Sequence, residues 1–506
     1  MLGQLLGVIL LALAPTSVAQ ESVAAPARPN IVLFTADTLR REHLGLYGYP
    51  RATSPRLDAL ARESVVFERA FAPMATTFPS HMTMLTGLYP HQHGHTSNRG
   101  AVRSPYEPAA GRLTLANALT AAGYRTGGFV SSAVLNERTG IGAGFQTYDG
   151  PPPNKPTRTS DETVAKALEW LAAGPAEQPF FLWIHVWDTH EPNTPRADME
   201  ARFAPDDTLR QWIGGRGLDV ALLDQAFNTD FSIGERFFLI AEQAEEPAKG
   251  GRRAGKPLKM APGKRLFTID AAGLERLHAR YDACVAQIDG EVGRLQDALV
   301  MRGSWANTAF LFCADHGQAL GENEHFGHGT NLQINVAVPL LMHFPAALGV
   351  PAQRNARLVS LADMLPTLFA RIGSAGLGDY AQQFRGTDAL AAEFARGHVF
   401  TAEATEFKRG KKQPFLCGVV TERWKLVPTD GGTAKLYDLA AAGEKADVAA
   451  ANPATVKELE ALLAAELRTA VLVPEGAEPV SLEQGELLDG LGALGYGGDD
   501  EDDDDD

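Results

Sequence analysis

The sequence predicts an α/β protein with a mostly parallel central sheet covered by helices on both faces. Three continuous apolar, β-rich runs are typical of buried parallel strands, at residues 31–36, 180–186 and 308–313. Helical patterns lie between these runs, and the clearest places apolar or aromatic residues at 3.6-residue spacing from Leu274 to Leu299. Strands that alternate with helices form parallel sheets with helices on both sides.

Length and composition set the domain organisation and exclude several classes of protein. The chain has 506 residues, 45% hydrophobic and 21% charged, which excludes a disordered or collagen-like chain. We expect a catalytic domain at 29–395, a small subdomain at 396–472 and a tail at 473–506. The net charge of −16 includes eight acidic residues at 499–506, so the rest carries −8 and predicts no stable nucleic-acid partner. Three cysteines exclude a scaffold built from disulfides.

The N-terminus has the pattern of a signal peptide. Residues 5–14 are an apolar run of ten, too short to span a bilayer. Small residues at 17–19 predict cleavage after Ala19, so residues 1–19 would be removed and the protein secreted or periplasmic. No later segment approaches the roughly 18 apolar residues of a transmembrane helix, so we expect no membrane span.

Two later regions differ from the catalytic domain. Residues 249–265 contain seven basic and no acidic residues, which indicates either a solvated surface loop or a lid that attracts a polyanionic substrate. Strand-like pieces at 423–427 and 435–439 are followed by an amphipathic helix near 454–470. This pattern predicts a small C-terminal α+β subdomain.

Acidic residues and histidines follow the three predicted strands. Sites in open α/β sheets form at the carboxyl ends of strands. A mixture of carboxylate and imidazole groups suits zinc, manganese or iron better than calcium, and six such residues could form two adjacent metal sites. Singly, each of these residues is as well explained by a helix cap or a structural histidine. The candidates are Asp37, Asp188, His190, Asp315, His316 and His328.

The segment 76–90 offers a nucleophile. A threonine hydroxyl needs a metal or a base to lower its pKa before it can attack an ester. Pro79 follows Thr77 closely, and a helix starting here would present free N–H groups to an anion. The alternative is that Thr77 is only a helix cap.

Short motifs along most of the chain resemble the sulfatase family of the alkaline phosphatase superfamily. They are residues 29–31 with 37–40, 85–90 with 93–94, 122–126, 314–317 and 338–340. The pieces at 423–426 and 436–439 also resemble the small C-terminal subdomain of that family. The resemblance implies an alkaline phosphatase-like fold and a hydrolase of phosphoric or sulfuric esters.

Three stretches depart from the sulfatases that use a formylglycine nucleophile. The C/S-x-P-x-R motif reads Thr-Phe-Pro-Ser-His at 77–81, and the Gly-Lys-Trp-His segment reads Val-Ser-Ser-Ala at 130–133. The calcium-binding Asp-Asp pair reads Asp37-Thr38. Because threonine cannot be converted to formylglycine, we expect no formylglycine in this protein.

The stretch at Thr77 instead resembles the nucleotide pyrophosphatase/phosphodiesterase branch, in which a threonine is the nucleophile at a two-zinc centre. The implied ligands are Asp37, Thr77, Asp315 and His316 for one metal and Asp188, His190 and His328 for the other. Asn98 matches an asparagine that helps to hold the phosphoryl oxygen in that branch. The Asp188-to-His190 spacing is shorter than the branch pattern. Lipoteichoic acid synthases use a threonine with one manganese, so the implied cofactor is two zinc ions or one manganese.

Together these features predict a metal-dependent hydrolase that cleaves an anionic phosphate or sulfate ester through Thr77, with phosphate favoured. Two alternatives stay open: a sulfuric ester hydrolase with a Thr nucleophile, and an inactive protein that binds anionic glycans or lipid head groups. Among the other histidines, we expect His81 to support the Thr77 loop and His93 to be structural. His325 is a rival to His328. The oligomeric state is not predicted.

Overall fold

The structure is a computed structural model that describes most of residues 28–470 and residues 487–488. Side chains are not described at 153–154, 217–270, 323–325, 375, 404–414, 430 and 442, although short strands are present at 225–228, 242–243, 264–268, 407–408 and 411–412. The predicted signal peptide, the acidic tail and His325 lie outside the described residues. So do residues 249–263 of the basic segment and all of its side chains.

The core of the protein is an eight-stranded, mostly parallel sheet with the strand order β13-β2-β12-β9-β1-β5-β3-β4. Its centre is β1 (Asn30–Ala36), which pairs in parallel with β5 (Phe180–Val186) on one side and β9 (Thr308–Ala314) on the other. These are the three predicted strands, and every residue in them is buried. Continuous burial explains why they read as unbroken apolar runs.

The outer strands complete the sheet. β12 (Ala337–His343) runs antiparallel to its neighbours β9 and β2 (Ser64–Phe71). The edge strand β13 (Gln353–Ser360) is parallel to β2. At the other side β3 (Arg125–Val130) and β4 (Thr147–Asp149) continue the parallel arrangement from β5. The predicted mostly parallel sheet is confirmed, with β12 as the antiparallel exception.

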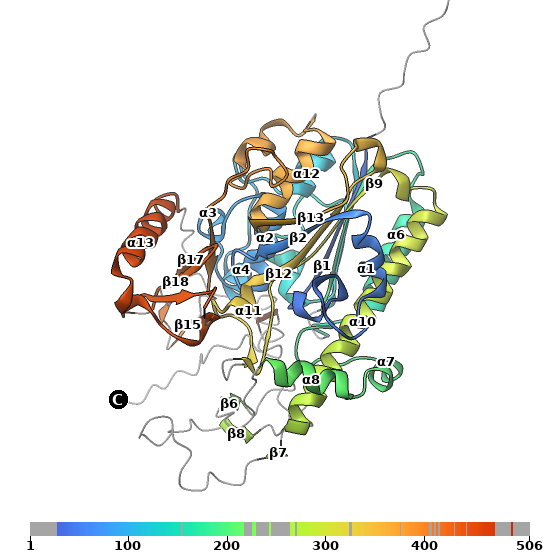
Figure 1. Ribbon diagram of the computed structural model, residues 1–506. Helices are drawn as coiled ribbons and strands as arrows, with labels where there is room; N and C mark the ends of the chain where they lie inside the picture. The colour runs from blue at the N-terminus through green and yellow to red at the C-terminus, as the bar shows by residue number, and fades with distance from the viewer. Residues whose placement is uncertain are drawn as a thin grey trace, which may run out of the picture.

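Helices cover both faces of this sheet (Figure 1). On one face lie α1 (Pro55–Ala61), α6 (Ser160–Ala173) and the long α10 (Ala271–Met301), and both shorter helices pack against α10. On the other lie α2 (Thr77–Thr86) and α12 (Met364–Ile372). The apolar stripe predicted from Leu274 to Leu299 is buried along α10, as expected for a helix that packs on a sheet.

The small C-terminal unit is an antiparallel four-stranded sheet with one helix, as predicted. Its strands are β14 (His398–Ala402), β17 (Cys417–Thr421), β18 (Trp424–Val427) and β19 (Lys435–Asp438), and α13 (Pro453–Leu467) packs on it. A parallel bridge between Met74 and Ala402 joins this unit to the segment that precedes α2. The boundary at residue 395 stays a prediction.

Two further expectations concern cysteines and membranes. Cys284, Cys313 and Cys417 are buried and form no disulfide. Within the described part of the chain, no helix is long and apolar enough to cross a bilayer.

Candidate active site

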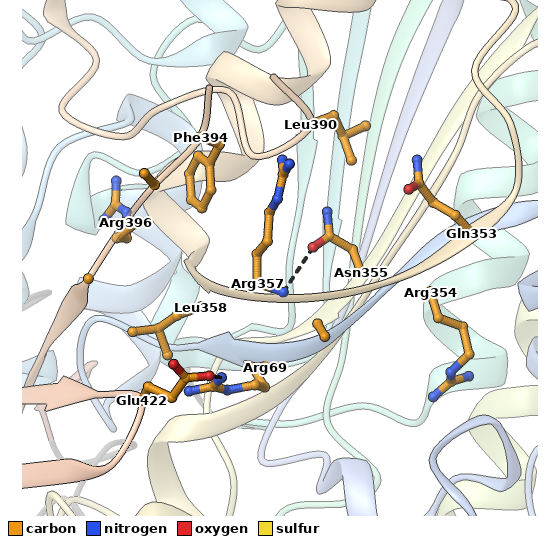
Figure 2. A pocket seen from close by; sticks show the side chains of 13 residues that line it. Arg69, Gln353, Arg354, Asn355, Arg357, Leu358, Leu390, Phe394, Arg396 and Glu422 are labelled. Carbon is orange, nitrogen blue, oxygen red and sulfur yellow. Dashed lines mark hydrogen bonds and ion pairs between the residues drawn. The ribbon is translucent and has the colours of Figure 1, made fainter. Parts of the chain in front are cut away.

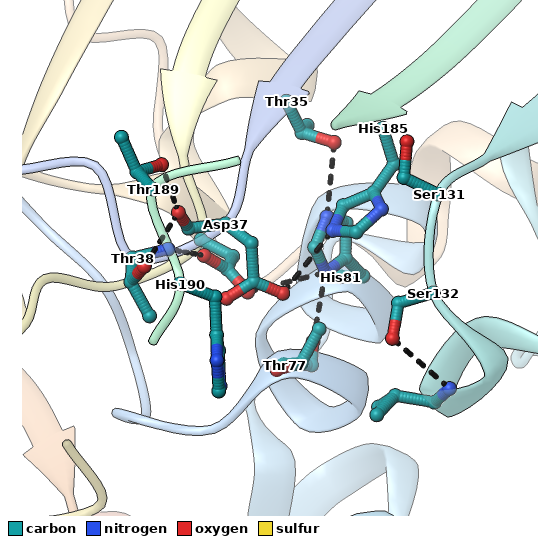
Figure 3. Close-up of polar contacts among 12 residues, drawn as sticks. Thr35, Asp37, Thr38, Thr77, His81, Ser131, Ser132, His185, Thr189 and His190 are labelled. Carbon is teal, nitrogen blue, oxygen red and sulfur yellow. Dashed lines mark hydrogen bonds and ion pairs between the residues drawn. The ribbon is translucent and has the colours of Figure 1, made fainter. Parts of the chain in front are cut away.

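A first cluster of candidate ligands lies at the carboxyl ends of β1 and β9. Asp37 follows β1, and Asp315 and His316 follow β9; one ligand atom from each lies within 4.8 Å of those of the other two. Thr77 is the first residue of α2, and its Oγ1 lies 3.5 Å from Nε2 of His316. All four residues are buried. The structure therefore brings together the four residues implied as the first metal site (Figure 3 shows Thr77 facing Asp37).

Backbone contacts hold the carboxylates of this first cluster in a defined orientation. Oδ1 of Asp315 accepts hydrogen bonds from the backbone N–H of Thr38 at 3.1 Å and of His316 at 2.8 Å. Nε2 of His185 lies 3.2 Å from Oδ2 of Asp37. The other oxygens, Oδ1 of Asp37 and Oδ2 of Asp315, are buried with no hydrogen-bond partner among the described residues. Burying a carboxylate oxygen destabilises the folded protein unless a cation or a hydrogen-bond donor faces it. These side chains therefore fit a bound divalent metal.

The electrostatics of the first cluster also fit a metal. Burial raises the pKa of Asp37 well above its usual value, and the nearby carboxylates of Asp315 and Glu191 raise it further, against a hydrogen bond from Thr77. Burial raises the pKa of Asp315 to about 6 and lowers that of His316 to about 4. Nδ1 of His316 donates to the Gly317 carbonyl, which leaves Nε2 as the coordinating nitrogen. A cation would stabilise both carboxylates in their ionised form.

A second cluster contains His190, Glu191 and His328, with ligand atoms again within 4.8 Å of one another. The Nε2 atoms of the two histidines face each other at 2.9 Å, although two neutral imidazoles share at most one hydrogen bond there. Burial lowers the pKa of His190 to about 3 and that of His328 well below its usual value. Oε2 of Glu191 is buried with no hydrogen-bond partner among the described residues. These neutral nitrogens and this oxygen also fit a divalent cation.

The two clusters adjoin, because the rings of His316 and His328 are 4.7 Å apart. His190 is held in place from behind: its ring stacks on Trp187 at 3.7 Å, and its Nδ1 lies 2.7 Å from the Glu191 carbonyl. The arrangement therefore places the second cluster directly beside the imidazole that completes the first.

Asp188 is the predicted ligand that the structure does not bring into the second cluster. Its carboxylate accepts hydrogen bonds from the backbone N–H and the hydroxyl of Ser160, both at 3.0 Å, and from the side chain of Gln287. Asp188 thus ties the end of β5 to the start of α6 and to α10. Glu191 takes its place beside the histidines, a residue that the sequence analysis missed. Its position directly after His190 was the only available signal.

Asn98 lies beside the start of α2, in contact with the residue that follows Thr77. Its Oδ1 accepts a hydrogen bond from the Phe78 N–H at 2.9 Å, so that N–H is not available to a substrate oxyanion. The Nδ2 of Asn98 is buried with no hydrogen-bond partner in the described part of the chain. The amide is therefore oriented by α2 and offers its own N–H groups.

Three histidines near Thr77 hold the site together. Nδ1 of His81 donates to the Thr77 carbonyl at 2.8 Å, and its Nε2 lies 3.0 Å from Oγ1 of Thr35, which confirms the expected support of the Thr77 loop. Nε2 of His93 lies 3.0 Å from the Pro79 carbonyl, which confirms a structural role. His185, which contacts Asp37, was not singled out in the sequence because it lies inside an apolar strand.

Comparison with known proteins gives a consistent result. The family model described as Sulfatase matches residues 29–374. An arylsulfatase from Clostridium perfringens is 26% identical over 428 residues, covering 77% of this chain and 85% of that protein. A mouse steryl-sulfatase is 26% identical over 402 residues, covering 70% and 63% of the two chains. The crystal structure of a phosphonate monoester hydrolase of Agrobacterium radiobacter superposes with a TM-score of 0.62 at 23% identity, covering 87% of this chain and 95% of that one.

Proposed function

The chain belongs to the sulfatase family of ester hydrolases, and from that premise we propose that it hydrolyses phosphate or sulfate esters with Thr77 as the nucleophile, phosphate esters being preferred. One observation carries the proposal. The Thr77 hydroxyl lies between the Asp37 carboxylate, to which it hydrogen-bonds, and Nε2 of His316 at 3.5 Å. A helix cap needs only the backbone N–H groups of the helix as partners. A threonine that also faces carboxylates and an imidazole of the kind that bind metals is better explained as a nucleophile.

We propose that the site holds two divalent ions, either zinc or manganese, or one manganese at the first cluster alone. Asp37, Thr77, Asp315 and His316 would hold the first ion, and His190, Glu191 and His328 the second. Support comes from the buried carboxylate oxygens that have no partner among the described residues. Bound cations would lower the pKa of the Thr77 hydroxyl and offset the charge of the ester oxygens.

The chain's own residues then account for the remaining steps. Oγ1 of Thr77 gives up its proton to water and attacks phosphorus or sulfur in line with the departing oxygen. The bond from phosphorus or sulfur to that oxygen breaks, the alkoxide takes up a proton from water and leaves as the alcohol, and a Thr77 ester forms. Nδ2 of Asn98 donates to a non-bridging oxygen on which negative charge develops. His81 holds the Thr77 carbonyl, so the nucleophile keeps its position during both halves of the reaction. Water then cleaves the Thr77 ester and restores the hydroxyl. We expect no formylglycine, because residue 77 is a threonine.

Charge supports phosphate over sulfate. The two clusters contain the carboxylates of Asp37, Asp315 and Glu191, together with three histidines whose pKa values are lowered. Before Thr77 loses its proton, two divalent cations would make this centre positive by about one charge, which favours the roughly two negative charges of a phosphate monoester over the single charge of a sulfate ester. A catalytic preference of at least about tenfold corresponds to roughly 1.4 kcal/mol of transition-state binding.

The test is a comparison of kcat/KM for nitrophenyl phosphate, bis-nitrophenyl phosphate and nitrophenyl sulfate with one zinc-loaded preparation. We expect both phosphate esters to react faster than the sulfate. The second candidate function, a sulfuric ester hydrolase with the same nucleophile, is favoured by the names of the two relatives above, and faster sulfate hydrolysis would establish it. An inactive protein that binds anionic glycans or lipid head groups would bind no metal and cleave none of the three esters.

We also propose that the protein is exported and cleaved after Ala19, because the first residues have the pattern of a signal peptide. N-terminal sequencing of the protein recovered from the periplasm or the medium should begin at Gln20. An intact Met1 in that fraction would contradict the proposal.

A further inference from the structure

A cavity of about 590 Å³ lies along the edge strand β13, separate from the two clusters (Figure 2). Its lining includes four arginines, Arg69, Arg354, Arg357 and Arg396, and one carboxylate, Glu422. Glu68, Asp363 and Glu422 pair with three of these arginines, which leaves an excess of about one positive charge here in a chain whose net charge is −16. Arginine is the residue best suited to bind sulfate and phosphate groups, because its planar N–H groups match their oxygens in pairs.

Three of the four arginines already have carboxylate partners. Arg396 lies 2.6 Å from the buried Asp363, and Arg354 lies 2.7 Å from Glu68. Arg69 lies 2.9 Å from Glu422, but 29% of the Arg69 side chain and 87% of the Glu422 side chain are exposed. An exposed ion pair of this kind contributes little to the stability of the fold. An anionic ligand can therefore replace Glu422 beside Arg69 with only a small loss of free energy.

Arg357 is the arginine without a carboxylate partner among the described residues. Its Nη1 donates to the carbonyls of Ala389 at 3.1 Å and Ala391 at 2.7 Å, and its guanidinium lies 5.7 Å from the centre of the Phe394 ring. Its backbone N–H donates to Oδ1 of Asn355 at 3.0 Å. These contacts fix the group from one side, and no described residue binds its Nε and Nη2. Arg357 is therefore held in place with one edge available to an oxyanion.

The cavity is connected to the Thr77 site by one short strand. Arg396 and Gly397 line the cavity and lead directly into β14, which ends at Ala402. Ala402 bridges to Met74, and its carbonyl accepts a hydrogen bond from Ala75, two residues before Thr77. Six residues of extended chain span about 20 Å. β14 itself is buried apart from His398, so a ligand that occupied both places would have to run along the surface and be at least about that long.

We propose that this arginine cavity binds a sulfate or phosphate group carried by an extended polyanion, another ester of which is cleaved at Thr77. The claim that another ester of the same chain is cleaved at Thr77 rests on the proposed function. The claim that the cavity binds an anion does not, because binding can be measured without turnover. Arg357 supplies the guanidinium group that contacts this anion. Arg69, which Figure 2 shows on the other side of β13, contacts a further anionic group of the same chain. Phe394 keeps the Arg357 guanidinium in position by a cation–π contact.

The experiment uses the full-length, zinc-loaded Thr77→Ala protein, so that no titrant is consumed. Short-chain dextran sulfate, inorganic sulfate and inorganic phosphate are each titrated in a calorimeter. We expect Arg357→Gln to raise the Kd for dextran sulfate by at least about tenfold, because an oriented, charged donor is lost. The matched control is Arg62→Gln, which removes an exposed guanidinium at the end of α1. It should leave that Kd unchanged.

A second variant covers the case in which Arg357→Gln does not fold, since Nη1 of Arg357 binds two carbonyls. Arg69→Gln changes a side chain on the surface of the cavity and should also raise the Kd for dextran sulfate. Unchanged affinity in the variants that fold would overturn the proposal. Inorganic sulfate or phosphate that binds as tightly as the chain, with the same dependence on these arginines, would show a site for free ions instead.

The link to Thr77 is tested with the wild-type enzyme. Dextran sulfate should inhibit nitrophenyl phosphate hydrolysis competitively, and Arg357→Gln should raise its inhibition constant by the same factor as its Kd. Binding without inhibition would reject an extended substrate that reaches both places. An enzyme that cleaves no nitrophenyl ester at all would reject the proposed function, and the calorimetric result on the cavity would still decide whether the anion binds there.

Discussion

The two clusters of the candidate site differ in how the fold positions them. In the first cluster, Ala36 of β1 pairs with Ala314 of β9, so Asp37 and Asp315 leave adjacent strands side by side. In the second cluster, His190 and Glu191 lie in the turn that follows Val186, and His328 follows the short strand β11 (Phe326–Gly327). The first is fully buried, whereas Glu191 and His328 are only partly buried.

This difference separates ligands fixed by a strand ladder from ligands fixed by turns. Parallel pairing sets the register of the first cluster, so a carboxylate placed one residue after each strand must face its neighbour. A turn has no such register, so residues close together in the sequence can face the same site or different parts of the fold. The three positions 188, 190 and 191 illustrate this, because Asp188 turns to α6 while His190 and Glu191 turn to the site.

The largest effect should come from the nucleophile, which belongs to the first cluster. Thr77→Ala should lower kcat for nitrophenyl phosphate by about 10³-fold or more, and Thr77→Ser should retain part of the rate because a hydroxyl remains. Initial-rate kinetics measure both. The control is Thr83→Ala on the same helix, whose hydroxyl donates a hydrogen bond to the Pro79 carbonyl. A Thr77→Ala enzyme with a near-normal rate would remove Thr77 from the mechanism.

Removal of a strand-end ligand should be the next largest effect. Asp315→Asn keeps the size of the side chain but removes the charge that would hold the first metal. We expect elemental analysis to show about one metal fewer per chain and kcat to fall by about 10²-fold or more. Full metal content in this variant would show that Asp315 orients Thr38 and His316 without binding the ion.

Substitutions in the second cluster should lower activity less, and Asp188, which lies outside that cluster, provides the comparison. His190→Ala, Glu191→Gln and His328→Ala should each lower the metal content and reduce kcat/KM by about 10-fold to 100-fold. Asp188→Asn should keep the metal and instead lower the free energy of unfolding by about 1–2 kcal/mol, because a charged acceptor at Ser160 and Gln287 is lost. Loss of metal in Asp188→Asn would restore Asp188 as the ligand. Unchanged metal in the other three would indicate a single ion and histidines that contact the substrate.

The two clusters should also differ in their sensitivity to acid. The raised pKa of Asp315, about 6, means that a proton competes with the metal at the first cluster below that pH. His190, with a pKa of about 3, stays neutral at pH 5, and burial also holds the pKa of His328 well below its usual value, so protons compete less at the second cluster. Because the pKa of Asp37 is also raised, zinc affinity should fall by about tenfold or more per pH unit below pH 6 in His190→Ala and less steeply in Asp315→Asn. Zinc titrations at pH 7 and pH 5 measure this, and equal slopes would contradict the assignment of acid sensitivity to the first cluster.

The sequence by itself determined the fold class and the first cluster. Apolar runs that end in Asp37 and Asp315 predict parallel strands whose ends share a polar cluster. The structure pairs these two strands directly, which leaves little freedom in where their first polar residues point. The apolar stripe on α10 could be predicted in the same way, because buried positions recur with the period of the helix. Thr77 and His316 could be added because each lies within a short motif at the end of a strand or the start of a helix.

Only the tertiary structure decided the remaining features of the site. The exchange of Asp188 for Glu191, the orientation of Asn98 by the Phe78 N–H and the contact of His185 with Asp37 all depend on segments that are far apart in the sequence. The arginine cavity depends on such contacts as well, because Arg69, Arg357 and Arg396 come from different segments. No local pattern encodes these contacts, since a side chain in a turn or a loop takes its direction from whatever packs against it.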